Sequence, residues 1–321
     1  MWRMRLTGNK TLVGNKPLVV ILGATATGKT RLGIAIAQAL NGEIVGADSR
    51  QVYQHMDIGT AKPTTAEREA AVHHLVDYID PKDHLSLAKY QQTAYATIEA
   101  IQARGKLPLL VGGTGQYVTA IVEGWSIPKV APNLALREEL EAVATEEGNL
   151  ALHGRLQALD PLYAEKIHPN NVRRVVRALE VCLTTGDTVT NLQQKQPPPY
   201  EILTIGLHMD REKLYARADH RLDMMIEAGF LEEVRGLLAM GYDRHLPAMS
   251  AVGYAEVLRH ICDDEPLEQV LTEAKHNTHD FIRKQEIWFR GHDHGILWHN
   301  VDYANSDTIV QMVKNWREEL G

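Results

Sequence analysis

Short apolar runs alternate with segments of helical spacing over the first 122 residues of the chain. Runs rich in apolar residues occupy positions 18–22, 43–47 and 107–111, and the segments between them repeat apolar side chains every three or four positions. Buried strands that alternate with helices in this way are typical of a parallel sheet. The pattern therefore predicts a β-α-β fold for this part of the chain.

The pattern changes after Gly124. From residue 128 to about residue 199 the apolar spacing is helical throughout, and three consecutive prolines close the segment. An apolar run at 202–207 then predicts a further strand. We therefore expect an α/β fold in which residues 1–122 and 201–321 form a parallel sheet flanked by helices. Residues 123–200 are expected to form an inserted, all-helical domain.

An octapeptide directly follows the first predicted strand and leads into a predicted helix. Its residues are Gly23, Ala24, Thr25, Ala26, Thr27, Gly28, Lys29 and Thr30. In this context the glycines let backbone N–H groups point at an anion, and the helix N-terminus adds partial positive charge. Lys29 supplies a charge to the outer phosphates, and the hydroxyl of Thr30 can bind Mg²⁺. The sequence thus predicts a phosphate-binding P-loop at the centre of the core.

The residues after the next two predicted strands indicate which type of reaction takes place at this loop. The strand at 107–111 ends in Gly112, Gly113 and Thr114 rather than in the acidic pair of a hydrolysing P-loop protein, and the strand at 43–47 is followed by Asp48. Because the carboxyl ends of parallel strands converge on the ligand, we expect Asp48 and Thr114 to face it. Asp48 has an alternative interpretation as the N-cap of the next helix. The arrangement favours group transfer over hydrolysis.

The composition is that of an ordinary globular protein, with 44% hydrophobic and 23% charged residues. Two cysteines lie far apart and outside any metal-ligand spacing, which argues against a disulfide framework or zinc site and for a cytoplasmic location. No apolar run approaches the roughly 18 residues of a membrane helix. The residues before Lys16 are expected to be poorly ordered.

The charge is distributed unevenly along the chain. A net charge of −7 argues against nonspecific adhesion to nucleic acid over the whole surface. Two basic clusters nevertheless stand out: Arg173, Arg174 and Arg177 in the insertion, and Arg283, Lys284 and Arg290 near the C-terminus. Helical spacing puts Arg173 and Arg177 on one face, which is either a solvated charged face or a site for an anionic partner. The sequence has no acidic residue in this helix before Glu180, which favours the anionic partner.

Nine motifs together resemble those of the tRNA dimethylallyltransferase family, in its bacterial form. They extend from about residue 17 to about residue 290 and are GATATGKT at Gly23, ADSRQVY at Ala47, MDIGTAKP at Met56, HHLVD at His73, LLVGGTGQY at Leu109, IHPNNVRRVVRALEV at Ile167, EAGFLEEV at Glu227, AVGYAE at Ala251 and RKQEIWFR at Arg283. A P-loop alone says little about activity, whereas MDIGTAKP together with the Gly-Gly-Thr strand end is specific. The chain departs from the family in its tail, where His279 follows Thr278 and the basic run is Arg283-Lys284-Gln285.

The resemblance implies an enzyme that transfers a dimethylallyl group from dimethylallyl diphosphate to N6 of the adenosine on the 3′ side of the tRNA anticodon. Asp48 is our candidate for the general base, while Lys29, Thr30 and Arg221 stabilise the departing diphosphate with Mg²⁺ as cofactor. The acceptor base must leave its stack to reach a buried site. The resemblance also implies a set of tRNA contacts: Asp48, Ser49, Arg50, Gln51, Thr114, Arg137, Arg173, Arg174 and Arg177.

Three other functions fit parts of the sequence. An adenylate isopentenyltransferase shares the P-loop and the base but acts on free nucleotide, and the helical insertion with its arginines favours tRNA instead. A small-molecule kinase would turn over ATP, and a nucleotide-gated RNA-binding module would form no prenyl product. The protein is expected to act as a monomer.

Overall fold

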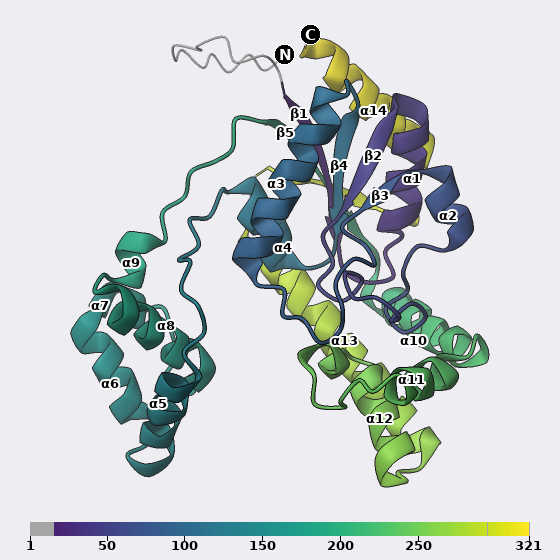
Figure 1. Cartoon of the computed structure of the whole chain (residues 1–321). Coiled ribbons are helices and arrows are strands. Elements are labelled where there is room, and N and C mark those ends of the chain that lie inside the picture. Colours follow the sequence, from purple (N-terminus) through teal and green to yellow (C-terminus); the bar gives the residue numbers. More distant parts are fainter. Residues whose placement is uncertain (1–15, 294, 321) are drawn as a thin grey trace, which may run out of the picture. The chain divides into compact units, whose positions relative to one another are not determined.

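The computed structural model describes residues 16–293 and 295–320 (Figure 1). The residues before Lys16, which were expected to be poorly ordered, lie outside the described residues. The chain divides into two compact units, one made of the described residues up to Val122 and from Pro199 onward, the other of Glu123–Pro198. Within the described residues, no helix has the length and apolar character to cross a membrane.

The larger unit is built on a six-stranded parallel sheet. Its strands are β1 (Pro17–Gly23), β2 (Gly42–Gly46), β3 (His73–His74), β4 (Leu107–Gly112), β5 (Glu201–His208) and β6 (Leu297–Asn300). They lie in the order β3-β2-β4-β1-β5-β6, so β1 has β4 on one side and β5 on the other. The four longer strands are those predicted from the sequence, and the parallel α/β fold is confirmed.

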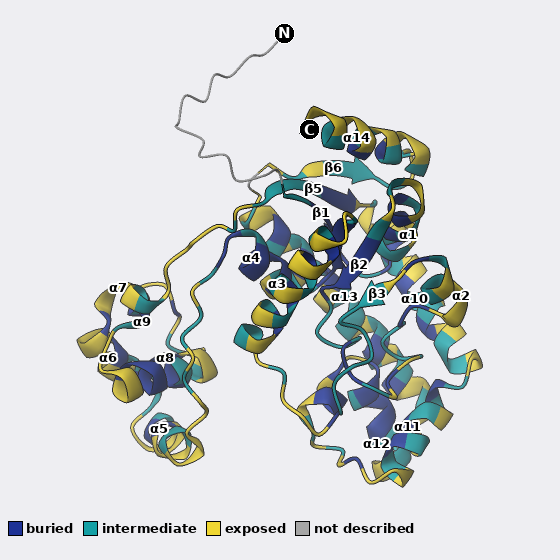
Figure 2. Ribbon diagram, turned by 45° about the horizontal axis from the view of Figure 1, so that its top comes forward, coloured by how far each residue is buried: buried dark blue, intermediate teal, exposed yellow. Residues whose placement is uncertain are grey.

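Helices cover both faces of this sheet (Figures 1 and 2). The helices of the larger unit are α1 (Lys29–Leu40), α2 (Thr65–Ala70), α3 (Leu87–Ala103), α4 (Gly115–Val122), α10 (Arg211–Glu227), α11 (Phe230–Ala239), α12 (Tyr254–Asp263), α13 (Leu267–Gly291) and α14 (Ser306–Glu319), with a 3₁₀ turn at Pro247–Ser250. Successive residues of β1 point to opposite faces. Val19 and Ile21 pack with α1 and α14, whereas Leu18 and Val20 pack with α3 and α4.

A third apolar cluster joins the loop after β2 to helices α10–α13. Val52 and Met56 are fully buried there against Phe230 and Tyr254. A Cβ at Gly59 would lie 2.2 Å from the Phe230 ring, so this glycine allows the loop to approach α11 closely. The loop that begins at Asp48 is consequently held by helices far along the chain.

The smaller unit is all helical and has a core of its own. Its helices are α5 (Leu134–Glu146), α6 (Asn149–Leu159), α7 (Pro161–Ala164), α8 (Val172–Thr185) and α9 (Val189–Leu192). Leu140, Leu152, Leu156, Val175 and Leu179 are among its buried residues. The two ends of the unit form an antiparallel pair, in which the N–H of residue 196 donates to the carbonyl of residue 124 at 2.8 Å.

Candidate active site

The phosphate-binding loop connects β1 to α1 through residues with positive φ. Gly23, Ala26 and Gly28 have φ values of 148°, 63° and 87°. A Cβ at Gly23 would lie 2.4 Å from the carbonyl oxygen of Leu207, so β5 leaves no room for a side chain there. The predicted loop conformation thus depends on glycine at a specific close approach between strands.

Lys29 is the first residue of α1 and lies across the loop. Its Nζ donates to the carbonyl of Ala24 at 2.7 Å, and the buried hydroxyl of Thr27 donates to the same carbonyl at 2.8 Å. The unpaired N–H groups of the first helical turn lie at the same place. The loop therefore offers an ammonium group and backbone donors to one anion.

Two cations and one carboxylate share the space next to this loop. Burial lowers the pKa of Lys29 to about 8, an effect that the negative charge of Asp48 opposes and the positive charge of Arg221 reinforces. Burial likewise lowers the pKa of Arg221, again against the effect of Asp48. Residues 29, 48 and 221 come from α1, the end of β2 and α10, so the fold brings together three residues that the sequence predicted to be catalytic.

Asp48 begins a tight turn rather than a helix. Its Oδ1 accepts the N–H groups of Arg50 at 2.8 Å and Gln51 at 3.3 Å. The next helix, α2, begins at Thr65 and has Thr64 as its N-cap, so the alternative interpretation of Asp48 as a helix cap is wrong. Within the described chain, Oδ2 of Asp48 makes no hydrogen bond. One carboxylate oxygen holds the turn while the other is available for chemistry.

Thr114 ties the end of β4 to this turn. Its Oγ1 accepts the N–H of Ser49 at 2.9 Å, and its own N–H donates to the carbonyl of Ala47 at 3.1 Å. The convergence of strand ends predicted from the sheet thus takes the form of direct hydrogen bonds.

The side chains of Arg50 and Gln51 bind other loops of the same unit. The Arg50 guanidinium donates to the carbonyl of Pro247 at 2.7 Å, and the Gln51 amide donates to the carbonyls of residues 60–61 at 3.1 and 2.9 Å. Both side chains therefore stabilise the surroundings of Asp48. Their assignment as tRNA contacts stays a prediction.

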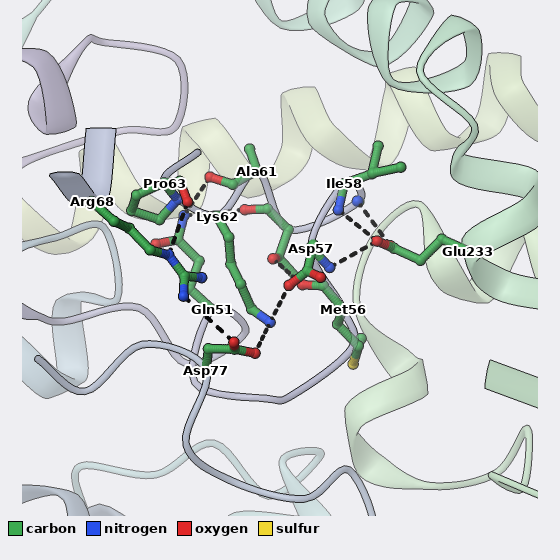
Figure 3. A network of polar contacts seen from close by, with 12 residues as sticks. Gln51, Met56, Asp57, Ile58, Ala61, Lys62, Pro63, Arg68, Asp77 and Glu233 are labelled. Atoms are coloured by element: carbon green, nitrogen blue, oxygen red, sulfur yellow. Dashed lines mark hydrogen bonds and ion pairs between the residues drawn. The ribbon is translucent and has the colours of Figure 1, made fainter. Parts of the chain in front are cut away.

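A polar network anchors the MDIGTAKP segment (Figure 3). Nζ of Lys62, whose side chain is 1% exposed, lies 2.6 Å from a carboxylate oxygen of Asp57 and 2.6 Å from one of Asp77. The carboxylate of Glu233 on α11 accepts the three consecutive N–H groups of residues 57–59 at 2.7–3.2 Å. Since Gln51 is bonded to this segment, the network also supports the turn at Asp48.

Several residues that shape the site were not predicted from the sequence. For Lys62 the sequence does contain an indication, because the only other charged residue of its motif is Asp57, which has the opposite charge. For Glu233 and Gln285 the indication is weaker. Both lie in motifs that resemble those of the family, but the backbone groups that they bind are far away in the sequence. Gln285 bonds Thr25 of the phosphate loop across 260 positions.

In the helical unit, the predicted tRNA contacts Arg137 and Arg177 share a buried partner. Glu180 is fully buried and accepts from Arg137, from Arg177 and from the N–H of Asn133 at 2.7 Å. Burial by itself would raise the pKa of Glu180, but these hydrogen bonds and charges lower it to about 2. The sequence analysis noted that the helix has no acidic residue before Glu180, and the structure shows that Glu180 itself is the partner of Arg177.

Arg173 and Arg174 are the exposed arginines of α8. The Arg174 guanidinium lies 5.9 Å from the ring centroid of Tyr163. Arg173 has no polar partner among the residues that the structure describes. These two side chains are free to meet an anion from solution, and their role in tRNA binding stays a prediction.

The residues at the loop fit a magnesium ion that takes few of its ligands from the protein. Among residues 16–293 and 295–320, no cluster of three or more His, Cys, Asp or Glu side chains forms a metal site. Thr30 is a partly exposed residue in the first turn of α1, and its hydroxyl makes no hydrogen bond within the same residues. Mg²⁺ commonly takes one or two protein oxygens and completes its shell with phosphate oxygens and water.

The sheet order and the loop between β1 and α1 make this a P-loop-type protein, and its site combines two cationic side chains with a carboxylate. The sequence profile of the family described as IPP transferase matches residues 51–292. The chain belongs to this family, as the nine motifs predicted.

Named relatives agree with this membership. A tRNA dimethylallyltransferase of Chloroflexus aggregans is 54% identical over 273 residues, which cover 85% of this chain and 92% of that protein. One of Herpetosiphon aurantiacus is 52% identical over 298 residues, covering 92% and 94%.

Solved structures agree as well. The tRNA isopentenylpyrophosphate transferase of Bacillus halodurans superposes with a TM-score of 0.70 at 37% identity, covering 95% of this chain and 97% of that one. A eukaryotic dimethylallyltransferase acting on tRNA superposes with a TM-score of 0.83 at 26% identity, covering 95% and 80%.

Proposed function

We propose that this enzyme transfers the dimethylallyl group of dimethylallyl diphosphate to N6 of the adenosine on the 3′ side of the anticodon in tRNA, releasing diphosphate. The observation that carries the proposal is the grouping of Lys29 and Arg221 around the phosphate loop with Asp48 beside them. A cationic site for a leaving group next to a free carboxylate oxygen suits a reaction in which one substrate loses an anion and the other loses a proton.

The first requirement is stabilisation of the departing diphosphate. As the bond between carbon and the bridging oxygen breaks, negative charge develops on that oxygen, and preorganised donors in a water-poor site stabilise it. Lys29 and the loop N–H groups would bind the diphosphate from one side and Arg221 from another. The partial burial that lowers the pKa of Lys29 also strengthens its interaction with an anion.

The second requirement is removal of a proton from N6. The lone pair of the adenine amino group is delocalised into the ring, so the nitrogen attacks well only when a base accepts its proton as the new carbon–nitrogen bond forms. Oδ2 of Asp48 is the acceptor that we assign. The bonds from Arg50 and Gln51 to Oδ1 hold the carboxylate in one orientation for that task.

We infer that Mg²⁺ is the cofactor, held by the Thr30 hydroxyl together with the diphosphate. When bound, the ion would neutralise charge on the diphosphate oxygens. We place the reaction in the cytoplasm and expect a monomer; both stay predictions.

Transfer to tRNA rather than to free nucleotide is supported by the independent helical unit. Its exposed Arg173 and Arg174 suit contacts with backbone phosphates, which position a nucleic acid without reading its sequence. A target base buried at Asp48 has to be flipped out of its stack.

The proposal is tested by incubating the protein with Mg²⁺, labelled dimethylallyl diphosphate and unmodified tRNA that has adenosine 3′ to its anticodon. Mass spectrometry of the tRNA nucleosides should find N6-dimethylallyladenosine, with diphosphate released in equal amount. AMP, ADP and ATP serve as competing acceptors. Label in free nucleotide alone would establish the adenylate enzyme instead, and label in neither would refute prenyl transfer.

A further inference from the structure

Gln285 is a buried amide in the C-terminal half of α13, directly beside the phosphate loop. It is 6% exposed and lies on the buried stripe of the helix between Ile282 and Phe289. An amide in such a place is costly unless its donors and acceptor find partners. Its position among apolar neighbours therefore requires specific hydrogen bonds.

Both ends of the Gln285 side chain are used, and they bind two different loops. Its Oε1 accepts the N–H of Thr25 at 2.9 Å, and its Nε2 donates to the carbonyl of Gly113 at 2.8 Å. Thr25 belongs to the phosphate loop after β1, and Gly113 follows β4. One side chain thus bridges the ends of two adjacent strands, in addition to the hydrogen bonds of the sheet.

The bridge is tightly packed on the side of the phosphate loop. A Cβ added to Gly113 would lie 2.6 Å from Nε2 of Gln285, 3.3 Å from the carbonyl oxygen of Gly23 and 3.5 Å from Nζ of Lys29. Glycine at position 113 is therefore what allows the amide to sit between the two loops.

The bridge continues to the acceptor side of the site. Thr114, next to Gly113, accepts the N–H of Ser49, and Asp48 accepts the N–H groups that follow. A connected path of hydrogen bonds and short backbone segments therefore leads from the loop that would bind the diphosphate to the carboxylate that would take the proton.

We propose that Gln285 is a positioning residue that sets the separation between the phosphate loop and the turn at Gly113 and Thr114. The inference rests on the proposed function, because it assigns the two loops to the two substrates. Transfer requires the carbon of one substrate and the nitrogen of the other within reacting distance, and a misplacement of about 1 Å can cost 10²-fold in rate. Gln285 acts through the loops and need not touch either substrate.

The test uses Gln285→Met, which keeps an unbranched side chain of similar length but removes both hydrogen bonds. The matched control is Gln102→Met, because Gln102 is a partly buried glutamine that donates to the carbonyl of Pro17 at 3.1 Å, at the opposite end of β1. Each variant is assayed by single-turnover transfer, by KM for tRNA and by hydrogen exchange of the Thr25 amide in protein labelled with ¹⁵N-threonine.

We expect Gln285→Met to lower kcat by about 10- to 100-fold, leave KM for tRNA within about threefold, and accelerate exchange of the Thr25 amide. Gln102→Met should change none of the three. A kcat for folded Gln285→Met that matches the wild type or the control would overturn the proposal. If the wild type transfers no prenyl group, the proposed function fails, and the exchange of Thr25 still decides the positioning role.

A second variant covers the case in which Gln285→Met does not fold. Gln285→Glu keeps an acceptor for the Thr25 N–H and loses the donor to Gly113. It should protect the Thr25 amide while kcat falls. Wild-type kcat in Gln285→Glu would mean that the bond to Gly113 has no role in positioning.

Discussion

The protonation state of Lys29 should affect how tightly the protein binds a diphosphate. Burial holds its pKa at about 8 in the free protein, well below the ordinary 10.5. A bound diphosphate favours the charged form and raises that pKa. Below pH 8 the lysine is already protonated, whereas above pH 8 binding must first take up a proton.

We therefore predict that affinity for an unreactive thio analogue of dimethylallyl diphosphate is flat below pH 8 and falls by up to tenfold per pH unit above it. Calorimetry between pH 7 and 9.5, in buffers of different ionisation enthalpy, should detect the proton taken up. Lys29→Met should bind more weakly at every pH and lack the decline. A flat profile in the wild type would place the pKa of Lys29 outside this range.

Asp48 allows a sharp test of base catalysis. Asn at this position retains an oxygen to accept the N–H groups of Arg50 and Gln51, so the turn should persist while the base is lost. We predict that Asp48→Asn lowers kcat by about 10²–10⁴. Both substrates should still bind, as measured by fluorescence titration with the thio analogue and with tRNA. Near-normal single-turnover transfer would remove Asp48 from the mechanism.

Whether the role of a residue could be predicted from the sequence depends on how far along the chain its interaction partners lie. The phosphate loop was predictable because its geometry depends on neighbouring residues, and Asp48 and Thr114 were placed together by a general property of parallel sheets. Gln285 and Glu233 were not predictable in this way. Their partners are backbone groups in distant loops, which residue type and spacing do not specify.

At the level of elements, α8 separates two kinds of arginine. Arg177 shares the buried Glu180 with Arg137, whereas Arg173 and Arg174 are exposed. For each phosphate that a basic side chain neutralises, the logarithm of the affinity falls by about 0.7–0.9 for every tenfold increase in salt concentration. The two kinds should therefore respond differently to substitution.

We predict that Arg173→Ala with Arg174→Ala weakens tRNA binding and reduces the salt slope by roughly one to two units. Binding of the thio analogue should not change. Arg177→Ala should instead destabilise the helical unit by about 1–3 kcal/mol, because Glu180 loses a partner. Affinities at several salt concentrations and thermal unfolding measure both effects, and an unchanged slope would move tRNA binding toward Arg283, Lys284 and Arg290.

The length of a strand decided whether it could be predicted from the sequence. The four strands of five to eight residues lie in runs rich in apolar residues, whereas β3 has two residues and β6 has four. Edge strands this short contain too few positions for a pattern. Their pairing depends on the strands beside them rather than on their own residues.

For the whole molecule, both connections to the helical unit leave the core near Tyr95. Its hydroxyl donates to the carbonyl of Ile121 at 2.9 Å, and its ring lies 6.2 Å from that of Tyr200. We predict that replacing residues 123–198 with a short Gly-Ser linker leaves a folded core. This core should bind the thio analogue with unchanged affinity and tRNA at least tenfold more weakly. Undiminished tRNA binding would show that the core alone holds the substrate.

The place of the insertion also affects how the chain folds during synthesis. β1 lies between β4, which precedes the insertion, and β5, which follows it. A ribosome adding about 5–20 residues per second takes on the order of ten seconds to make the insertion. Throughout that interval the central strand of the nascent sheet has an open edge, which is a site for aggregation. The helical unit has its own core and can fold meanwhile, so the length of the insertion sets how long this edge of β1 waits for β5.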